Sequence, residues 1–258
     1  MKSILFEKIG NLAVIKLNRP DKLNCFNQEM AFLLQDLLAT CESDSEIRAI
    51  YLTGVGRAFC AGQDLEEAIS EDGPELTQIV EKHYNPIVQA IRNIEKPFVA
   101  AVNGVAAGAG ANIALACDIV VATEAASFIQ AFSAIGLIPD SGGTYTLPRL
   151  IGWQKASALM MLGDKVKADE AERMNMIYKV FPNEEFEESS MKLAKRLSSM
   201  PTKGLGLTKR ALNSSLTNTM EDQLALEGDL QTLAGGTYDY TEGVNAFLEK
   251  RKPNYKGQ

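Results

Sequence analysis

Histidine and cysteine are both scarce in this sequence, which has one histidine and four cysteines in 258 residues. The cysteines, Cys25, Cys41, Cys60 and Cys117, are widely separated and form no C-x-x-C pair. Neither a disulfide framework nor a zinc site is indicated, and we expect no bound metal. The lone His83 lies on a helix-like segment, where a histidine is more often a packing or surface residue than a catalytic base.

An excess of positive charge is also absent, because 33 acidic residues outnumber 26 basic ones and the net charge is −7 at pH 7. This balance argues against an electrostatic surface for nucleic acid, so we expect no nucleic-acid partner. The nearest approach to a basic cluster is 250–252, Lys-Arg-Lys. Such a run is typical of a solvated helix end, although it can also meet a phosphate-bearing ligand.

Long apolar runs are missing as well. The first seven residues lack the apolar stretch of a signal peptide, and Lys or Glu soon interrupts every apolar run elsewhere. We therefore expect a cytoplasmic protein with no membrane partner. Hydrophobic residues make up 46% of the chain, which is enough for a substantial core.

Strand and helix patterns alternate in the first part of the chain, which favours an α/β architecture with ligand sites where strands end and helices begin. Asn27 has the features of a helix N-cap before a helical apolar pattern. Strands are predicted over 4–8, 12–17, 47–52, 97–102 and 118–122, and a long helix over 75–94. From about residue 150 the predicted elements are helices, over 152–162, 167–174, 184–199, 204–214, 218–234 and 239–249.

Two turns rich in small residues follow predicted strands, over 57–65 and 104–112. Free N–H groups at a helix start favour negative charge, so two such turns could supply the converging donors of an oxyanion hole. Two other interpretations of the second turn stay open. Small residues also serve tight packing, and a dinucleotide site would need a third glycine where the sequence has Ile113.

Asp140 follows Ile-Gly-Leu-Ile-Pro and precedes Ser-Gly-Gly-Thr. Apolar surroundings would desolvate its carboxylate and raise its pKa toward that of a useful general base. The same position is also suited to a helix N-cap, which would lower the pKa instead. The local sequence taken alone favours the cap.

Taken together, these segments resemble the crotonase, or enoyl-CoA hydratase/isomerase, superfamily. The resemblance covers essentially the whole chain and depends on the order and spacing of several short motifs. They are Leu17-Asn18-Arg19-Pro20 with Asn24, Phe59 to Leu65, Val102-Asn103-Gly104 with the small-residue turn, Cys117-Asp118-Ile119, Gly136 to Pro139 with Gly142-Gly143, and Phe247 to Arg251.

The resemblance implies a crotonase-like spiral of ββα units over residues 1–195, carrying an acyl-CoA site. A helical oligomerisation region over 196–258 is expected to complete the CoA pocket, in a homotrimer or a dimer of trimers. The substrate would be an acyl-CoA thioester, and no separate cofactor is expected because coenzyme A is part of the substrate.

The family's site residues transfer to numbered positions of this chain. The N–H groups that bind the thioester oxygen correspond to Ala61 and Ala109. Positions matching those that hold CoA and the acyl group are Lys22, Leu23, Gly62, Gln63, Asp64, Leu65, Asn112, Phe132 and Lys250.

This sequence departs from the hydratases, whose two catalytic glutamates fall at Asn112 and Phe132. An amide and a phenyl ring cannot activate water, so isomerisation is expected rather than hydration. Asp140 matches the carboxylate of ring-1,2-epoxyphenylacetyl-CoA isomerases and some Δ3,Δ2-enoyl-CoA isomerases, and would shuttle a proton. Asn112 would orient substrate polar groups and Phe132 would pack on the acyl group, or both would be core residues. An enoyl-CoA hydratase, a 4-chlorobenzoyl-CoA dehalogenase-like enzyme and a non-catalytic acyl-CoA-binding protein are the alternatives.

Overall fold

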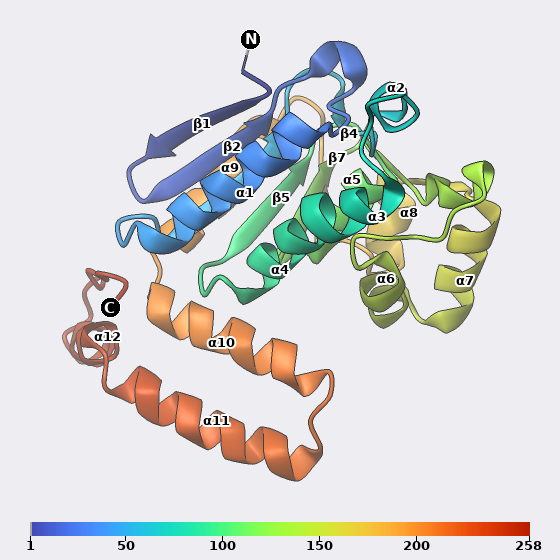
Figure 1. Ribbon diagram of the computed structural model, residues 1–258. Helices are drawn as coiled ribbons and strands as arrows, with labels where there is room; N and C mark the ends of the chain where they lie inside the picture. Colours follow the sequence, from blue (N-terminus) through green and yellow to red (C-terminus); the bar gives the residue numbers. More distant parts are fainter. Residues whose placement is uncertain (1) are drawn as a thin grey trace.

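The computed structural model describes residues 2–258, which form an α/β body and a helical tail (Figure 1). The body contains a six-stranded sheet in the order β1-β2-β3-β5-β7-β10. β1 and β2 form an antiparallel hairpin, and each later neighbour in this sheet pairs in parallel. The strands are β1 (Ile4–Ile9), β2 (Leu12–Leu17), β3 (Ala49–Gly54), β5 (Phe98–Val102), β7 (Ile119–Thr123) and β10 (Lys179–Phe181).

A second sheet is built from short strands that the sequence analysis did not predict, in the order β4-β6-β8-β9. They are β4 (Ala58–Cys60), β6 (Val105–Ala107), β8 (Ser127–Ile129) and β9 (Lys165–Lys167). β4, β6 and β8 each follow directly on a strand of the larger sheet, namely β3, β5 and β7. This repeated strand–strand–helix unit confirms the predicted ββα spiral.

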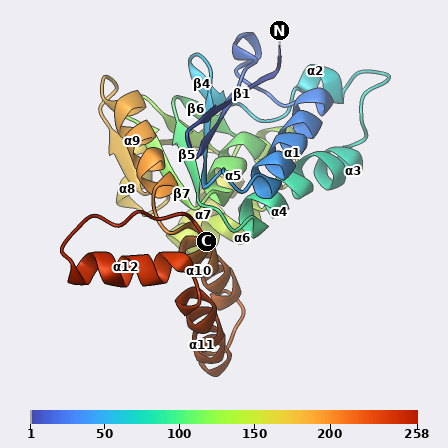
Figure 2. The same ribbon diagram turned by 90° about the vertical axis from the view of Figure 1, so that its left-hand side faces the viewer.

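The helices of the body cover both faces of the larger sheet (Figures 1 and 2). Asn27 is the N-cap of α1, as predicted, and its side chain accepts from the Met30 N–H. The long helix expected over 75–94 is present without a gap from 76 to 93, and its middle part is a π-helix, so it consists of α3, η2 and α4. The helical segments are η1 (Pro20–Lys22), α1 (Gln28–Ser43), α2 (Leu65–Ala68), α3 (Leu76–Gln78), η2 (Ile79–Tyr84), α4 (Asn85–Asn93), α5 (Ala109–Ala116), η3 (Ala131–Ile135), α6 (Gly143–Ile151), α7 (Trp153–Leu162), α8 (Ala168–Arg173) and α9 (Phe186–Ser198).

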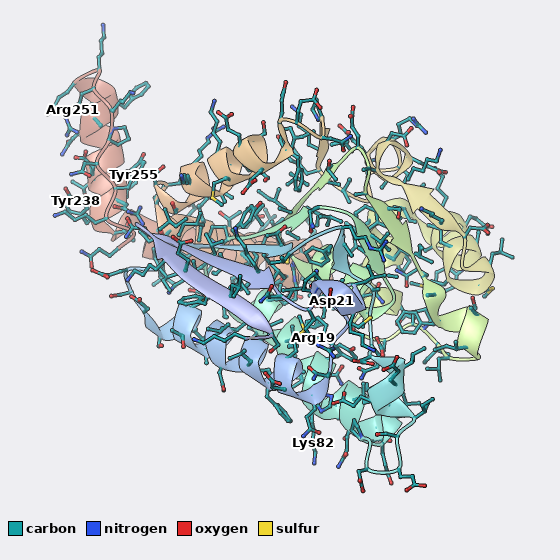
Figure 3. The ribbon with its side chains drawn as sticks, turned by 90° about the horizontal axis from the view of Figure 1, so that it is seen from above. Arg19, Asp21, Lys82, Tyr238, Arg251 and Tyr255 are labelled. Atoms are coloured by element: carbon teal, nitrogen blue, oxygen red, sulfur yellow. The ribbon has the colours of Figure 1, made fainter. Side chains whose placement is uncertain are left out.

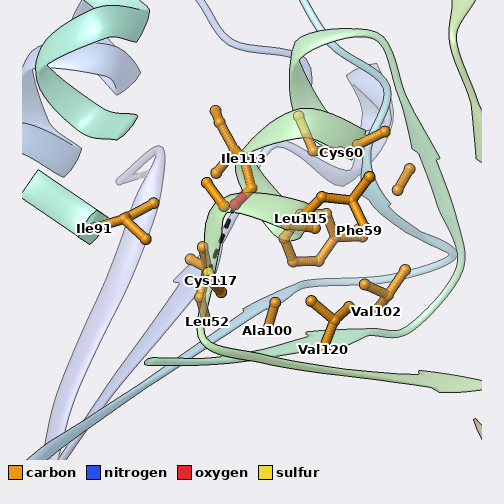
Figure 4. Close-up of a cluster of buried hydrophobic side chains, with 14 of the residues drawn as sticks. Leu52, Phe59, Cys60, Ile91, Ala100, Val102, Ile113, Leu115, Cys117 and Val120 are labelled. Atoms are coloured by element: carbon orange, nitrogen blue, oxygen red, sulfur yellow. Dashed lines mark hydrogen bonds between the residues drawn. The ribbon is translucent and has the colours of Figure 1, made fainter. Parts of the chain in front are cut away.

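Two apolar cores lie on opposite faces of the larger sheet. The larger one joins the sheet to α1, α4 and α5, and Figure 4 shows part of it, including Phe59, Ile113 and Val120. On the other face Tyr51 and Val99 pack against α9 residues such as Leu197. Burial on both faces explains why the parallel strands are nearly continuous apolar runs rather than alternating ones.

The tail consists of α10 (Thr202–Ser215), α11 (Met220–Gly235) and α12 (Tyr238–Leu248), and all three were predicted from the sequence. α10 and α11 form a hairpin that projects from the body, as both ribbon views show (Figures 1 and 2). After α12 the chain turns back, and the Asp239 carboxylate accepts from the N–H groups of Lys256 and Gly257. Within 2–258, every helix is too short or too polar to span a membrane.

Candidate active site

A cavity of about 490 Å³ lies where β4 and β6 end, with walls from α2, α3, η2 and the segment from η3 to Asp140. Its lining is apolar except for three side chains, those of Gln63, Tyr84 and Asp140. The fold brings together seven of the predicted site residues here: Ala61, Gly62, Gln63, Leu65, Ala109, Phe132 and Asp140. Five others, Lys22, Leu23, Asp64, Asn112 and Lys250, do not line this cavity.

The first predicted donor, the Ala109 N–H, stands at the start of α5. Gly108 enters the helix with φ 52° and ψ −128°, a conformation that glycine adopts without strain. As the first helical residue, Ala109 has no carbonyl one turn earlier in the helix to accept its N–H. A Cβ on Gly110 would overlap the backbone oxygen of Cys60, so the small residues serve close packing as well as the open N–H.

The prediction that Ala61 supplies the second donor is wrong, because its N–H donates to the Leu23 carbonyl at 3.0 Å. Gln63 is the better candidate. The residues on either side of Gln63 bond to the backbone of Phe26, through the Gly62 carbonyl at 2.7 Å and the Asp64 N–H at 2.8 Å. The intervening Gln63 N–H points away from that pairing and has no hydrogen-bond partner within residues 2–258.

The two turns that carry these donors lie against each other. A Cβ built on Gly62 would be 3.7 Å from the Ala109 nitrogen and 3.1 Å from the Ala107 oxygen. The N–H groups of Gln63 and Ala109 therefore form the pair that can bind a developing oxyanion. The segment 61–64, Ala-Gly-Gln-Asp, offers several neighbouring backbone N–H groups. Only its hydrogen bonds to the backbone of Leu23 and Phe26 determine which of these N–H groups is open.

Asp140 is not a helix cap, so the preference drawn from local sequence was wrong. The N-cap of α6 is Gly142, which makes no side-chain cap, and Asp140 contributes only its main-chain oxygen, to the Gly143 N–H at 2.9 Å. Its carboxyl faces the apolar cavity, and burial raises its pKa above the ordinary value of 3.8. A hydrogen bond from the Ser141 hydroxyl, at 2.8 Å, opposes this rise in part.

Asn112 does not line the cavity, so of its two expected roles the structure supports the core residue and not the one that orients substrate. It is almost fully buried, and its Nδ2 donates to the Asp140 main-chain oxygen at 2.9 Å. Its Oδ1 accepts from Gln130 at 2.8 Å. Asn112 is thus a core residue that holds the Asp140 loop. Phe132 does line the cavity, and its ring lies beside Gly108.

The early loop is fastened to the turn after β4 rather than directed into the cavity. Lys22 pairs with Glu66 at 2.6 Å, and Arg19 pairs with Asp64 at 2.8 Å. Lys250 follows α12 on the tail. In Figure 3 its neighbour Arg251 lies at the outer end of the tail, well away from Arg19. That Lys22, Leu23 and Lys250 contact CoA stays a prediction. Lys250 would contact the CoA that is bound to a neighbouring subunit.

Comparison with known proteins agrees with this geometry. A sequence model described as enoyl-CoA hydratase/isomerase matches residues 7–258. The chain is 47% identical to the 1,2-epoxyphenylacetyl-CoA isomerase of Escherichia coli K12, with both chains covered completely. It is 44% identical to a probable enoyl-CoA hydratase of Rhodobacter capsulatus, over 99% of this chain and 98% of that one. The crystal structure of an enoyl-CoA hydratase from Bacillus anthracis matches with a TM-score of 0.92 and 31% identity, covering 100% of both chains. The chain therefore belongs to the enoyl-CoA hydratase/isomerase family, the crotonase superfamily.

Proposed function

We propose that this protein is an acyl-CoA isomerase that shifts a double bond, or rearranges a ring epoxide, through a thioester enolate. The observation that supports it is the placement of one desolvated carboxyl, Asp140, in the same apolar cavity as the open N–H groups of Gln63 and Ala109. A base, an oxyanion site and an apolar acyl pocket are the parts that enolate chemistry needs.

For a 3-enoyl thioester the steps balance with one proton. The Asp140 carboxylate removes a proton from the carbon beside the carbonyl, and the electron pair moves onto the carbonyl oxygen. The two N–H groups stabilise that charge more strongly in the enolate than in the substrate, which is the condition for acceleration. Protonated Asp140 then returns the proton farther along the chain, and the double bond moves next to the thioester.

Hydration is the competing activity within the family. The E. coli relative is named as an isomerase, and the R. capsulatus relative is named as a probable hydratase. Asp140 is the one carboxylate among the cavity's lining residues, and the Asn112 amide is occupied by Asp140 and Gln130. Water addition requires groups that hold and activate water, so one base in an apolar cavity favours proton transfer. The lining also contains no histidine or tryptophan, which argues against dehalogenase-like chemistry.

The test is incubation of the purified protein with 3-enoyl-, 2-enoyl- and arylacetyl-CoA thioesters. Bond migration is expected, with 2-enoyl-CoA hydrated far more slowly than the double bond migrates. Rapid formation of 3-hydroxyacyl-CoA would instead identify a hydratase. Exchange of the α-proton in heavy water separates catalysis from binding. A protein that only binds acyl-CoA does not incorporate deuterium at the α-carbon.

We also propose that the chain assembles as a homotrimer or a dimer of trimers. The tail leaves large apolar side chains uncovered, and Phe247 is 83% exposed. Light scattering at micromolar protein should give three or six times the 28.1 kDa of one chain. Phe247→Asp should shift the mass toward one chain, because an unpaired charge is costly to bury. A monomeric mass for the parent protein would contradict this proposal.

A further inference from the structure

Both polar atoms of the Gln63 side-chain amide have hydrogen-bond partners. Its Oε1 accepts from the Tyr84 hydroxyl at 2.7 Å. Its Nε2 lies 3.4 Å from the Glu67 carboxylate, which in turn accepts from the Gln28 N–H at 3.0 and 3.1 Å. This is the residue whose backbone N–H faces the cavity, so restraint of its side chain also restrains the peptide that carries the donor.

Tyr84 is well placed to act as an anchor. It is 1% exposed, and its ring meets the ring of Phe26 edge to face with centroids 5.9 Å apart. The backbone of Phe26 clamps the residues on both sides of Gln63. Burial strongly raises the pKa of the Tyr84 hydroxyl, which therefore stays protonated and can donate at any working pH.

The π-helix explains how Tyr84 reaches this position. Ile79 and Tyr84 are five residues apart at the two ends of η2, and both line the cavity. In an α-helix, at about 100° per residue, side chains five positions apart would diverge by roughly 140°. The wider π turn places them on one side, in keeping with the frequent occurrence of π-bulges at functional sites.

We propose that Tyr84 is a positioning residue that fixes, through the Gln63 side chain, the peptide N–H that binds the enolate oxygen. This inference rests on the proposed enolate chemistry. The hydroxyl of Tyr84 makes its hydrogen bond to Gln63 rather than to Asp140 or to another cavity residue. Its loss therefore misaligns a donor without removing the base or the acyl pocket.

The test compares Tyr84→Phe with the matched control Tyr51→Phe. Tyr51 is also a buried tyrosine with a side-chain partner, Ser190 at 2.9 Å, but it belongs to the core on the α9 face of the sheet. Tyr84→Phe should lower kcat about tenfold with KM nearly unchanged, a fraction of the ~10²–10³ that loss of a whole oxyanion donor costs. Tyr51→Phe should leave kcat unchanged.

Gln63→Ala keeps the backbone N–H but removes the side chain that Tyr84 holds. It should therefore lower kcat by a factor similar to that for Tyr84→Phe. In the Gln63→Ala background, Tyr84→Phe should have no further effect, since residues that act as one unit are not additive. Unchanged turnover in Tyr84→Phe, or losses that multiply in the double variant, would overturn the proposal. If Tyr84→Phe does not fold, near-parental turnover in Gln63→Ala overturns it equally.

A binding measurement separates this inference from the proposed function. Acetoacetyl-CoA enolises readily, and its enolate can be followed by ultraviolet absorption without turnover. The enolised fraction of the bound ligand should fall in Tyr84→Phe, whereas affinity for S-butyl-CoA, a thioether without the carbonyl, should not change. An equal enolised fraction in parent and variant refutes the positioning role. Absence of isomerisation with every thioester refutes the proposed function alone.

Discussion

The core of the body and the outer surface of the tail differ in how far their large apolar side chains are buried. In the body, large side chains such as Phe26, Phe59 and Phe98 are at most 1% exposed. In the tail, Met220 is 70% exposed and Phe247 is 83% exposed. The body therefore forms its core and its cavity from one chain, whereas the tail presents apolar surface that one chain leaves in water.

The tail is joined to the body by Leu205, which packs on the core at the α9 face of the sheet, and by several charged groups. The Lys209 ammonium of α10 donates to Asp118 at 2.9 Å and to the Ile91 carbonyl at 2.6 Å, and lies over the Phe98 ring. Arg48 of the body donates to the carbonyls of Met200 and Tyr255. These bonds hold α10 in place, while the apolar side chains of α11 and α12 such as Leu224 and Phe247 stay exposed.

The largest expected effect concerns the body alone. Asp140→Asn should lower isomerase turnover by about 10²–10⁴, because it removes the base. CoA-thioester affinity should change little, since the N–H groups of Gln63 and Ala109 remain. The mass of the assembly should also be unchanged, because Asp140 lines a cavity to which no tail residue contributes. Near-parental turnover would leave the mechanism without a base.

The next effect tests the join between body and tail. Lys209→Met leaves Asp118 with fewer partners in a buried site and should lower the free energy of unfolding by up to about 3–5 kcal/mol. Lys203→Met is the matched control, since Lys203 also lies on α10 but forms a more exposed pair with Glu95 and should contribute under about 1 kcal/mol. Urea unfolding at one fixed protomer concentration measures both. Equal losses would show that burial of the lysine does not matter for this join.

The smallest effect sharpens the account of the base. The Asp140 carboxylate must be ionised to act, so kcat/KM should fall as the pH drops through its raised pKa. Ser141→Ala removes a hydrogen-bond donor that favours the charged form of Asp140, so the pKa of Asp140 should rise further. The acid limb of the pH profile of kcat/KM should therefore move to higher pH. The rate at neutral to alkaline pH should change little. A limb that stays in place, or moves to lower pH, would mean that Ser141 does not tune the base.

Much of the fold could be read from local pattern. The hairpin at 4–17, the N-cap at Asn27 and the helices after 150 were predicted within a few residues, because each depends on turn chemistry or on apolar periodicity. The three-residue strands β4, β6, β8 and β9 were not predicted. Strands of that length have no periodicity of their own and exist because the spiral brings them side by side.

The candidate site divides in the same way. The composition of the sequence pointed to the two small-residue turns, whereas Asp140 as a base and Phe132 as an acyl-contacting residue came from the family resemblance. A helix cap for Asp140 and a core position for Phe132 had stayed open. Tertiary structure decided which N–H is open, because the Leu23 carbonyl occupies that of Ala61 and leaves that of Gln63. It also decided that Asp140 faces an apolar cavity, with Asn112 behind its loop. These outcomes depend on which distant groups satisfy each hydrogen-bonding atom, and that choice is made only when segments far apart in the chain come into contact.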